Sequence, residues 1–155
     1  MKSIMQSSPV RILAIDLGQR RIGLAVSDEL GLTAQGMPTL ERTRVREDMR
    51  RLAELARANQ VALILLGHPL HMSGVEGRQA EGARQFGERL AAATGLPVKL
   101  WDERWTTVAA QRVFDESGIG IRKRSRGAVD RLAAVLLLES YLGWLDATRA
   151  GAEQG

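Results

Sequence analysis

The segment RILAIDLGQRRIGLAVSD, residues 11–28, contains two short runs of branched apolar residues separated by a turn with Gly18. Runs of this length and composition predict β-strands, and the tight turn predicts a hairpin. The first run is apolar at consecutive positions, which is typical of a central strand covered on both faces. The chain is therefore restricted to folds that cover both faces of a sheet, and they must place one carboxylate, Asp16, at a strand end.

Beyond residue 28 the pattern alternates strands with helices. A weaker strand is expected over residues 32–40, where Gly36 and Pro38 favour a sheet edge. The next segments predict a helix from Glu41, a strand over residues 61–69 and a helix that begins at a Ser73 cap and ends at about Thr94. In this second helix the residues expected to face inward are Val75, Ala83, Phe86 and Leu90. A strand over residues 96–103, a short helix over residues 107–117 and a long helix from about Ala128 to Ala147 complete the chain. This order predicts an α/β domain with a mixed sheet.

Composition limits the class of protein. A chain of 155 residues fits one domain, residues 1–155, in which residues 1–9 and 148–155 are expected to be flexible. The absence of cysteine excludes disulfides and thiolate metal sites. No signal peptide or membrane span is recognised, so a cytoplasmic protein is expected. The net charge of +4 favours an anionic partner without identifying it.

Acidic residues also lie at the ends of two other apolar elements, the last predicted strand and the final helix. Asp102 and Glu103 end the last predicted strand, and Asp130 lies in the first turn of the strongly apolar final helix. Each has an ordinary alternative: Asp16 can cap its turn, Asp102 or Glu103 can pair with Arg104, and Asp130 can complement the helix dipole. Together, acids at the rims of buried elements predict one cluster near the ends of central strands.

Such a cluster has a chemical consequence. Carboxylates close together repel one another and raise one another's pKa, so a cation would stabilise them. Oxygen ligands without cysteine favour Mg²⁺ or Mn²⁺. Two such ions can orient a water molecule and stabilise the leaving oxygen of a phosphodiester, which is the chemistry of a nuclease.

Four segments in this order, DLGQRRIGLAVSD, GHPLHMSG, WDERWTT and VDRLAA, resemble the YqgF family, also called RuvX, of RNase H-like nucleases. The resemblance extends from about Ile12 to Leu145. It implies a five-stranded mixed sheet with helices on both faces. It also implies a metal-binding active site formed by Asp16, the acidic pair of the last strand and Asp130.

Strand alternation allows only one acid of the pair Asp102 and Glu103 to face such a site. Asp102 is expected to be the inward acid and a metal ligand with Asp16 and Asp130, and Glu103 remains the alternative. The segment GHPLHMSG departs from the family pattern by carrying His68 and His71, the two histidines of the chain. They are expected to be tolerated variants, and a role as general base or phosphate contact is the alternative.

A basic segment precedes Asp130. Four cations fall within five positions and are expected to bind a phosphate backbone: Arg122, Lys123, Arg124 and Arg126. Arg20 and Arg21 are expected to add to this basic rim, although a charge run is often only a solvated loop. Trp101 and Trp105 flank the acidic pair, where Trp101 is expected in the core and either ring is a candidate for base stacking.

The resemblance implies a nuclease that processes the 5′ end of precursor 16S ribosomal RNA, with resolution of four-way DNA junctions as the alternative. Precursor RNA and a monomer are favoured, because symmetric junction cleavage needs a two-fold dimer and no segment offers an obvious interface. Two other classes remain. One is a phosphate-binding ATPase lobe, which also begins with a strand, an Asp and a Gly-rich hairpin, but such a protein needs a second lobe. The other is a non-catalytic nucleic-acid-binding module, which would not need the acidic residues.

Overall fold

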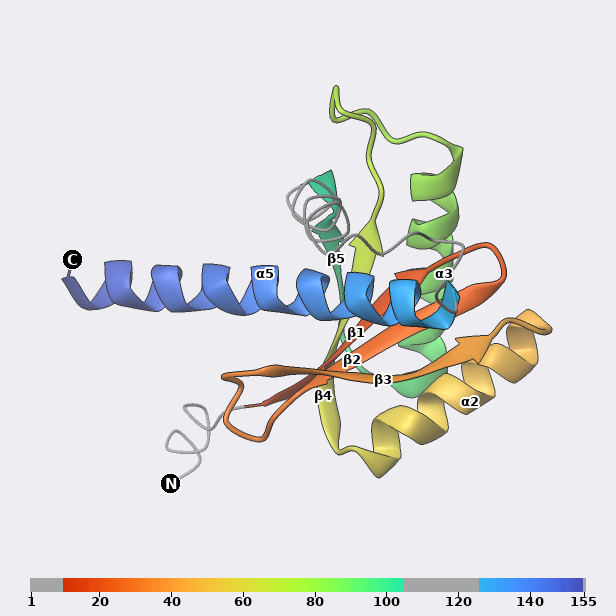
Figure 1. Cartoon of the computed structure of the whole chain (residues 1–155), viewed down its shortest axis with the longest axis horizontal. Coiled ribbons are helices and arrows are strands. Elements are labelled where there is room, and N and C mark those ends of the chain that lie inside the picture. The colour runs from red at the N-terminus through yellow and green to blue at the C-terminus, as the bar shows by residue number, and fades with distance from the viewer. Residues whose placement is uncertain (1–9, 105–125, 155) are drawn as a thin grey trace.

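The computed structural model describes residues 10–104 and 126–154, and in this part of the chain five strands form one mixed sheet (Figure 1). The strands are β1 (Arg11–Leu17), β2 (Arg21–Ser27), β3 (Ala34–Glu41), β4 (Val61–His68) and β5 (Val98–Asp102), in the order β3-β2-β1-β4-β5. β1 pairs antiparallel with β2 and parallel with β4. The predicted α/β class, the hairpin and the five-stranded mixed sheet are confirmed.

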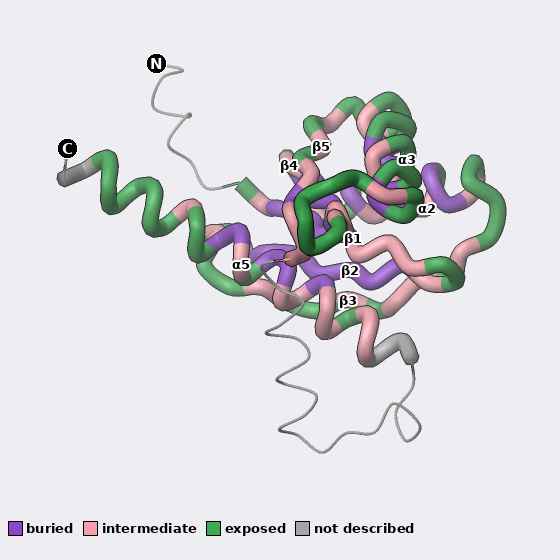
Figure 2. The backbone as a smooth tube through the Cα atoms, turned by 90° about the horizontal axis from the view of Figure 1, so that it is seen from above, coloured by how far each residue is buried: buried purple, intermediate pink, exposed green. Residues whose placement is uncertain are grey.

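Three helices cover the sheet in the described residues. α5 (Arg126–Gln154) lies on one face, and α2 (Val45–Ala58) and α3 (Arg78–Thr94) lie on the other (Figures 1 and 2). Alternation along β1 divides the core between the faces. Ile12 and Ala14 pack in the cluster that includes α5, and Leu13 and Ile15 pack in the cluster that includes α2 and α3. Asp16 continues the first series, so it belongs to the α5 face.

The first residue of α2 is determined by hydrogen bonds to a buried carboxylate. Met49 and Leu52 are buried as the helical stripe predicts, whereas Val45 is 36% exposed. The buried carboxylate of Asp48 accepts hydrogen bonds from the backbone N–H and the hydroxyl of Thr43, at 3.0 Å and 2.9 Å on Oδ1. This contact fixes the chain where it enters the helix. The helix therefore begins at Val45 rather than at Glu41.

The expected start of α3 was wrong. Ser73 does not cap this helix, because residues 69–77 form a separate loop in which the N–H of His71 bonds to the carbonyl of Val75 and Gly74 has a positive φ of 89°. The helix begins at Arg78, and Val75 is 60% exposed instead of inward. At the other end, Gly95 adopts the predicted left-handed conformation, with φ 73°.

α5 is longer than expected. The sequence predicted an end near Ala147, but the helix continues to Gln154, and its C-terminal part projects beyond the sheet in Figure 1. No proline interrupts this segment, and the hydroxyl of Thr148 bonds to the carbonyl of Trp144. β3 is an edge strand as predicted, with a register shift opposite residues 22–24 of β2.

Several expectations lie outside the described residues. They are the short helix over residues 107–117, Trp105, and Arg122, Lys123 and Arg124 of the basic segment. Within the described part, no helix is long and apolar enough to cross a bilayer.

Candidate active site

The site forms where β1, β4 and β5 end, on the face that α5 covers. Asp16 lies next to last in β1 and pairs in register with Gly23 of β2. This pairing matters because Gly23 is the point at which α5 approaches the sheet. A Cβ at Gly23 would lie 2.2 Å from the carbonyl oxygen of Asp130. The missing side chain therefore lets α5 bring Asp130 next to the strand pair that carries Asp16.

Glu103, the residue that follows β5, is the acid of the pair that reaches Asp16. Trp101 packs in the α5 cluster and Lys99 lies over the rings of Tyr141 and Trp144, so alternation places Glu103 on the same face. The N–H of Glu103 bonds to the carbonyl of His68 at 3.2 Å, which extends the pairing with β4 by one residue. The side chains of Glu103 and Asp16 are hydrogen-bonded to each other.

Gly67 provides the space for this pair. It lies in buried β4, and a Cβ there would lie 2.9 Å from the carboxyl carbon of Glu103. Two glycines, Gly23 and Gly67, thus determine where the carboxylates meet. The sequence analysis did not assign them this role, although an isolated glycine inside a strand pattern is a known signal of close approach.

The expectation that Asp102 is the inward acid is contradicted by its position. Its series includes Val98 and Leu100, which pack on the face of α2 and α3. Its carboxylate accepts hydrogen bonds from Arg104, at 2.6 Å from Nη2 and 2.9 Å from the backbone N–H. Arg104 also donates to the carbonyl of Met72, at 3.2 Å. Asp102 therefore connects the strand end to the loop of residues 69–77.

The three acids differ in their electrostatics. The hydrogen bonds from Arg104 hold the pKa of Asp102 below its ordinary value. Burial, with the nearby charge of Asp130, raises the pKa of Asp16. Burial and the adjacent Asp16 raise the pKa of Glu103 to about 8. The raised pKa of Glu103 means that the pair retains a proton near neutral pH, shared in the hydrogen bond between the two carboxyl groups.

This proton predicts how stability depends on pH. Between pH 5 and 8 the folded protein binds a proton at the Asp16–Glu103 pair that the unfolded chain has lost, so without metal the free energy of unfolding falls as pH rises through this window. We expect a decrease on the order of 3 kcal/mol, less than full conversion of the shift because the acid is not wholly buried. Urea denaturation at several pH values measures it.

The matched variant is Glu103→Gln, which cannot titrate. Its free energy of unfolding is expected to decrease less between pH 5 and 8 than that of the wild type, with any remaining decrease due to Asp16, whose pKa is also raised. Asp102 titrates below its ordinary range and contributes outside this window. An identical slope in both proteins would show that Glu103 does not carry the extra proton.

Asp130 is held by an arginine. Its Oδ2 lies 3.2 Å from Nε of Arg21, and both side chains are about three-quarters buried. Arg21 was expected to contact nucleic acid, but in this arrangement it neutralises a site carboxylate. Among the described residues, no three His, Cys, Asp or Glu side chains are close enough to hold a metal ion. Asp16 and Glu103 supply oxygen donors of the kind that a divalent cation prefers, and Asp130 is held near Asp16 by Arg21.

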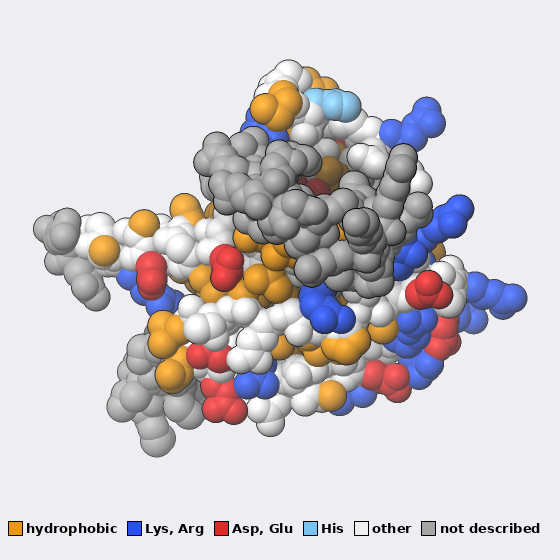
Figure 3. All heavy atoms as spheres, viewed as in Figure 1, with side chains coloured by type: hydrophobic (Ala, Val, Ile, Leu, Met, Phe, Trp, Pro, Cys, Tyr) orange, Lys and Arg blue, Asp and Glu red, His pale blue; other side chains and the backbone are white. Residues whose placement is uncertain are grey.

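The carboxylates lie between two surface hollows that share Gly18 and Gln19. The first, of about 590 Å³, is also lined by Arg20, Arg21 and Asp130, and the second, of about 300 Å³, includes Arg42 and Glu103. Lys and Arg side chains are interspersed with Asp and Glu along the right-hand edge of Figure 3. Beside the carboxylates, Arg20 and Arg21 line the first hollow and Arg42 lines the second, so cations border the site. Arg126 begins α5, and its side chain is not described.

The two histidines belong to the loop of residues 69–77 and its base. His68 Nε2 lies 2.8 Å from Oε2 of Glu76, which also pairs with Arg84 at 3.3 Å. His71 packs against Gly77, where a Cβ would lie 2.2 Å from its Nε2. Both histidines therefore make contacts within this loop or at its base. Their alternative role, as a general base or a phosphate contact, stays a prediction.

The predicted core position of Trp101 is confirmed. It is 6% exposed, and its ring meets Tyr141 edge-to-face at a centroid distance of 5.0 Å. Its indole N–H donates to the hydroxyl of Ser140 at 3.2 Å. Trp101 therefore anchors β5 to α5 and fixes which acid of the following pair faces Asp16.

Comparison with known proteins assigns the family. A family model described as "RuvX: Holliday junction resolvase" matches residues 10–143. The chain belongs to the RuvX family. RuvX relatives include a protein of Syntrophus aciditrophicus, 50% identical over 86% of this chain and 88% of its own, and one of Myxococcus xanthus, 46% identical over 90% of each chain. Both are named as candidate pre-16S rRNA nucleases.

Solved structures confirm the fold of this RuvX protein. Thermus thermophilus RuvC in complex with a Holliday junction substrate is 19% identical with a TM-score of 0.55, and the match covers 86% of this chain and 96% of RuvC. The Fowlpox virus resolvase bound to junction DNA is 13% identical with a TM-score of 0.51, over 87% and 98% of the two chains. At these identities the likeness concerns the fold, which is that of RNase H-like resolvases.

Proposed function

We propose that this RuvX protein is a metal-dependent nuclease that hydrolyses phosphodiester bonds at the Asp16–Glu103 pair. The observation that carries the proposal is the hydrogen bond between these two carboxyl groups, at the ends of the strands β1 and β5 that flank β4, with Asp130 close by. A partly buried pair with raised pKa values is typical of a functional site. The cations that border it suit a nucleic acid.

Asp16, Glu103 and Asp130 are the proposed ligands of Mg²⁺ or Mn²⁺, and Glu103 takes the place first assigned to Asp102. When bound, such ions supply an activated water molecule and charge stabilisation at the leaving oxygen. Binding requires the Asp16–Glu103 pair to lose its proton, so metal affinity is expected to rise as pH approaches 8. Arg21 holds Asp130 beside the pair, and Asp102 positions the neighbouring loop through Arg104.

The proposed substrate contacts are the cations around this site. Arg20 lines the hollow that contains Asp130, and the basic segment of Arg122, Lys123, Arg124 and Arg126 leads into α5. Phosphate contacts of this type position a strand without reading its bases. We propose precursor 16S ribosomal RNA as the substrate, because relatives that are 50% identical are named for it, and the cytoplasm as the place where the protein acts.

A direct comparison of substrates tests this choice. Purified protein with Mg²⁺ or Mn²⁺ is expected to shorten the 5′ leader of precursor 16S ribosomal RNA faster than it cuts a four-way DNA junction at equal concentration. The alternative follows from the family description and from the junction-bound fold relatives. Paired, symmetric cuts in the junction, with the precursor RNA left intact, would make a dimeric resolvase the better proposal.

A further inference from the structure

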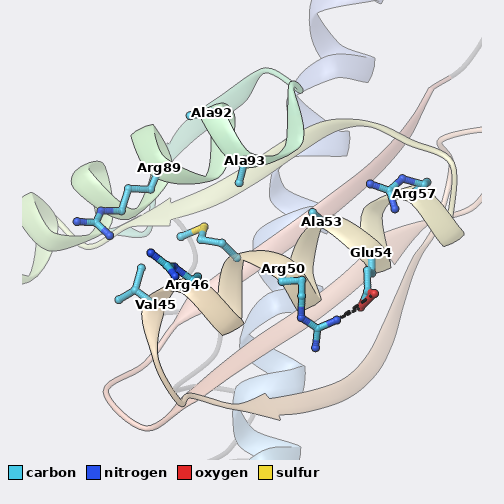
Figure 4. Close-up of a pocket in the computed structure, with 10 residues that line it drawn as sticks. Val45, Arg46, Arg50, Ala53, Glu54, Arg57, Arg89, Ala92 and Ala93 are labelled. Atoms are coloured by element: carbon cyan, nitrogen blue, oxygen red, sulfur yellow. Dashed lines mark hydrogen bonds and ion pairs between the residues drawn. The ribbon is translucent and has the colours of Figure 1, made fainter.

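A second surface lies on the opposite side of the sheet from the carboxylates, between α2 and α3. It is a groove of about 730 Å³ (Figure 4). Small or apolar side chains line its floor: Val45, Met49 and Ala53 of α2, and Ala92 and Ala93 of α3. Alanines at three of these positions leave the space between the two helices unfilled by side chains. Val45, Ala92 and Ala93 are exposed, so the apolar floor is open to solvent.

The rim of this groove is basic. Arg46, Arg50 and Arg57 come from α2, and Arg89 comes from α3. Arg50 is neutralised by Glu47 and Glu54, the second of which is drawn in Figure 4. Arg46, Arg57 and Arg89 are exposed, and none has an ion pair with another described residue. Figure 4 shows Arg46 and Arg89 toward one end of the groove and Arg57 toward the other.

We infer that this groove binds an acidic amphipathic helix of a partner protein. An apolar face would fill the alanine-lined floor, and carboxylates beside that face would meet the three unpaired guanidinium groups. Two helices with a groove between them are a common receptor for a third helix. α2 has 14 residues, so it matches a partner helix of about four turns. The occupant is complementary in shape, polarity and charge.

A single strand of RNA fits this surface less well. Strands without secondary structure are bound by cations together with aromatic rings on which the bases stack. No aromatic residue lines the groove among the described residues, and its floor is aliphatic. The groove also lies in the α2–α3 layer, whereas the carboxylates lie on the α5 face. Partner binding is thus an addition to the proposed nuclease activity and does not depend on it.

The test uses a fluorescein-labelled 16-residue helical peptide with Leu at positions i, i+3, i+4 and i+7 and Glu at the flanking positions. Fluorescence anisotropy is expected to show saturable binding to the full chain. The double variant Arg46→Glu/Arg89→Glu is expected to weaken it by about tenfold or more, since it replaces two attractions with repulsion between like charges. The matched control is Arg149→Glu, an exposed arginine on α5, which should leave binding unchanged.

Two further measurements keep the proposal falsifiable. Ala93→Trp fills the floor without altering charge and should also weaken peptide binding, while nuclease activity of all three variants stays at the wild-type level. A 16-nucleotide oligouridylate is the competing probe, and its binding should not respond to the groove variants. Absence of saturable peptide binding up to about 1 mM, equal binding by wild type and variants, or loss of oligouridylate binding in the variants would overturn the inference.

Discussion

Asp16→Asn and Glu103→Gln are each expected to abolish cleavage, lowering the rate by about 10³-fold or more, because each removes a charge that the proposed metal site needs. The fold should persist, since neither substitution empties a packed position and both relieve repulsion in a partly buried acidic pair. Single-turnover cleavage at saturating Mg²⁺ and thermal unfolding without metal measure the two effects. The unfolding midpoint at pH 8 should equal or exceed that of the wild type.

The informative control is Asp102→Asn. Asp102 is bound to Arg104 and faces the other layer, so its amide variant should keep cleavage within about tenfold of the wild type, with a loss due only to a loosened loop. Full activity in Glu103→Gln together with inactivity in Asp102→Asn would return the site to the assignment that the sequence first suggested.

Gly23→Ala is expected to cause the largest loss of stability, because a Cβ at Gly23 would lie 2.2 Å from the backbone oxygen of Asp130 and 2.7 Å from its carbonyl carbon. Backbone cannot rotate away as a flexible side chain can, so α5 must move from the sheet. We expect a loss of about 3 kcal/mol in the free energy of unfolding. Cleavage should fall by about a hundredfold even where the variant is folded, because Asp130 moves from Asp16.

Gly143→Ala provides the control within the same helix. A Cβ there meets nothing within 4 Å, so alanine should stabilise α5 by about 1 kcal/mol through helix propensity and leave cleavage unchanged. Denaturation by urea reports both variants. A Gly23→Ala protein with wild-type stability and activity would show that the close approach of α5 at Gly23 does not position Asp130.

Much of the fold follows from local pattern. The consecutive apolar residues of β1 and β4 predicted buried strands, and the amphipathic stripe of α2 predicted the residues that it buries, Met49 and Leu52. The start of α3 did not follow, because the hydrogen bonds within residues 69–77 compete with the Ser73 cap. The length of α5 was underestimated because composition alone does not distinguish an exposed helix end from a frayed tail.

The site could be predicted as a cluster but not at the level of one residue. Alternation required a single inward acid, yet Leu100 and Trp101 are both apolar, so the sequence alone does not say which of them faces α5. The answer depends on the packing of Trp101 against Tyr141, a contact between distant segments. The roles of Gly23 and Gly67 likewise depend on what approaches them, and the pairing of Arg21 with Asp130 joins residues 109 positions apart.

The central claim is that Asp16 and Glu103 together hold the catalytic metal. Crystals soaked with Mn²⁺ near pH 8 and measured at its absorption edge test it most directly. We expect an anomalous peak about 2.1 Å from carboxylate oxygens of both Asp16 and Glu103, with Asp102 still bound to Arg104. A peak coordinated by Asp102 instead, or none at the Asp16–Glu103 pair under conditions that support cleavage, would contradict the claim.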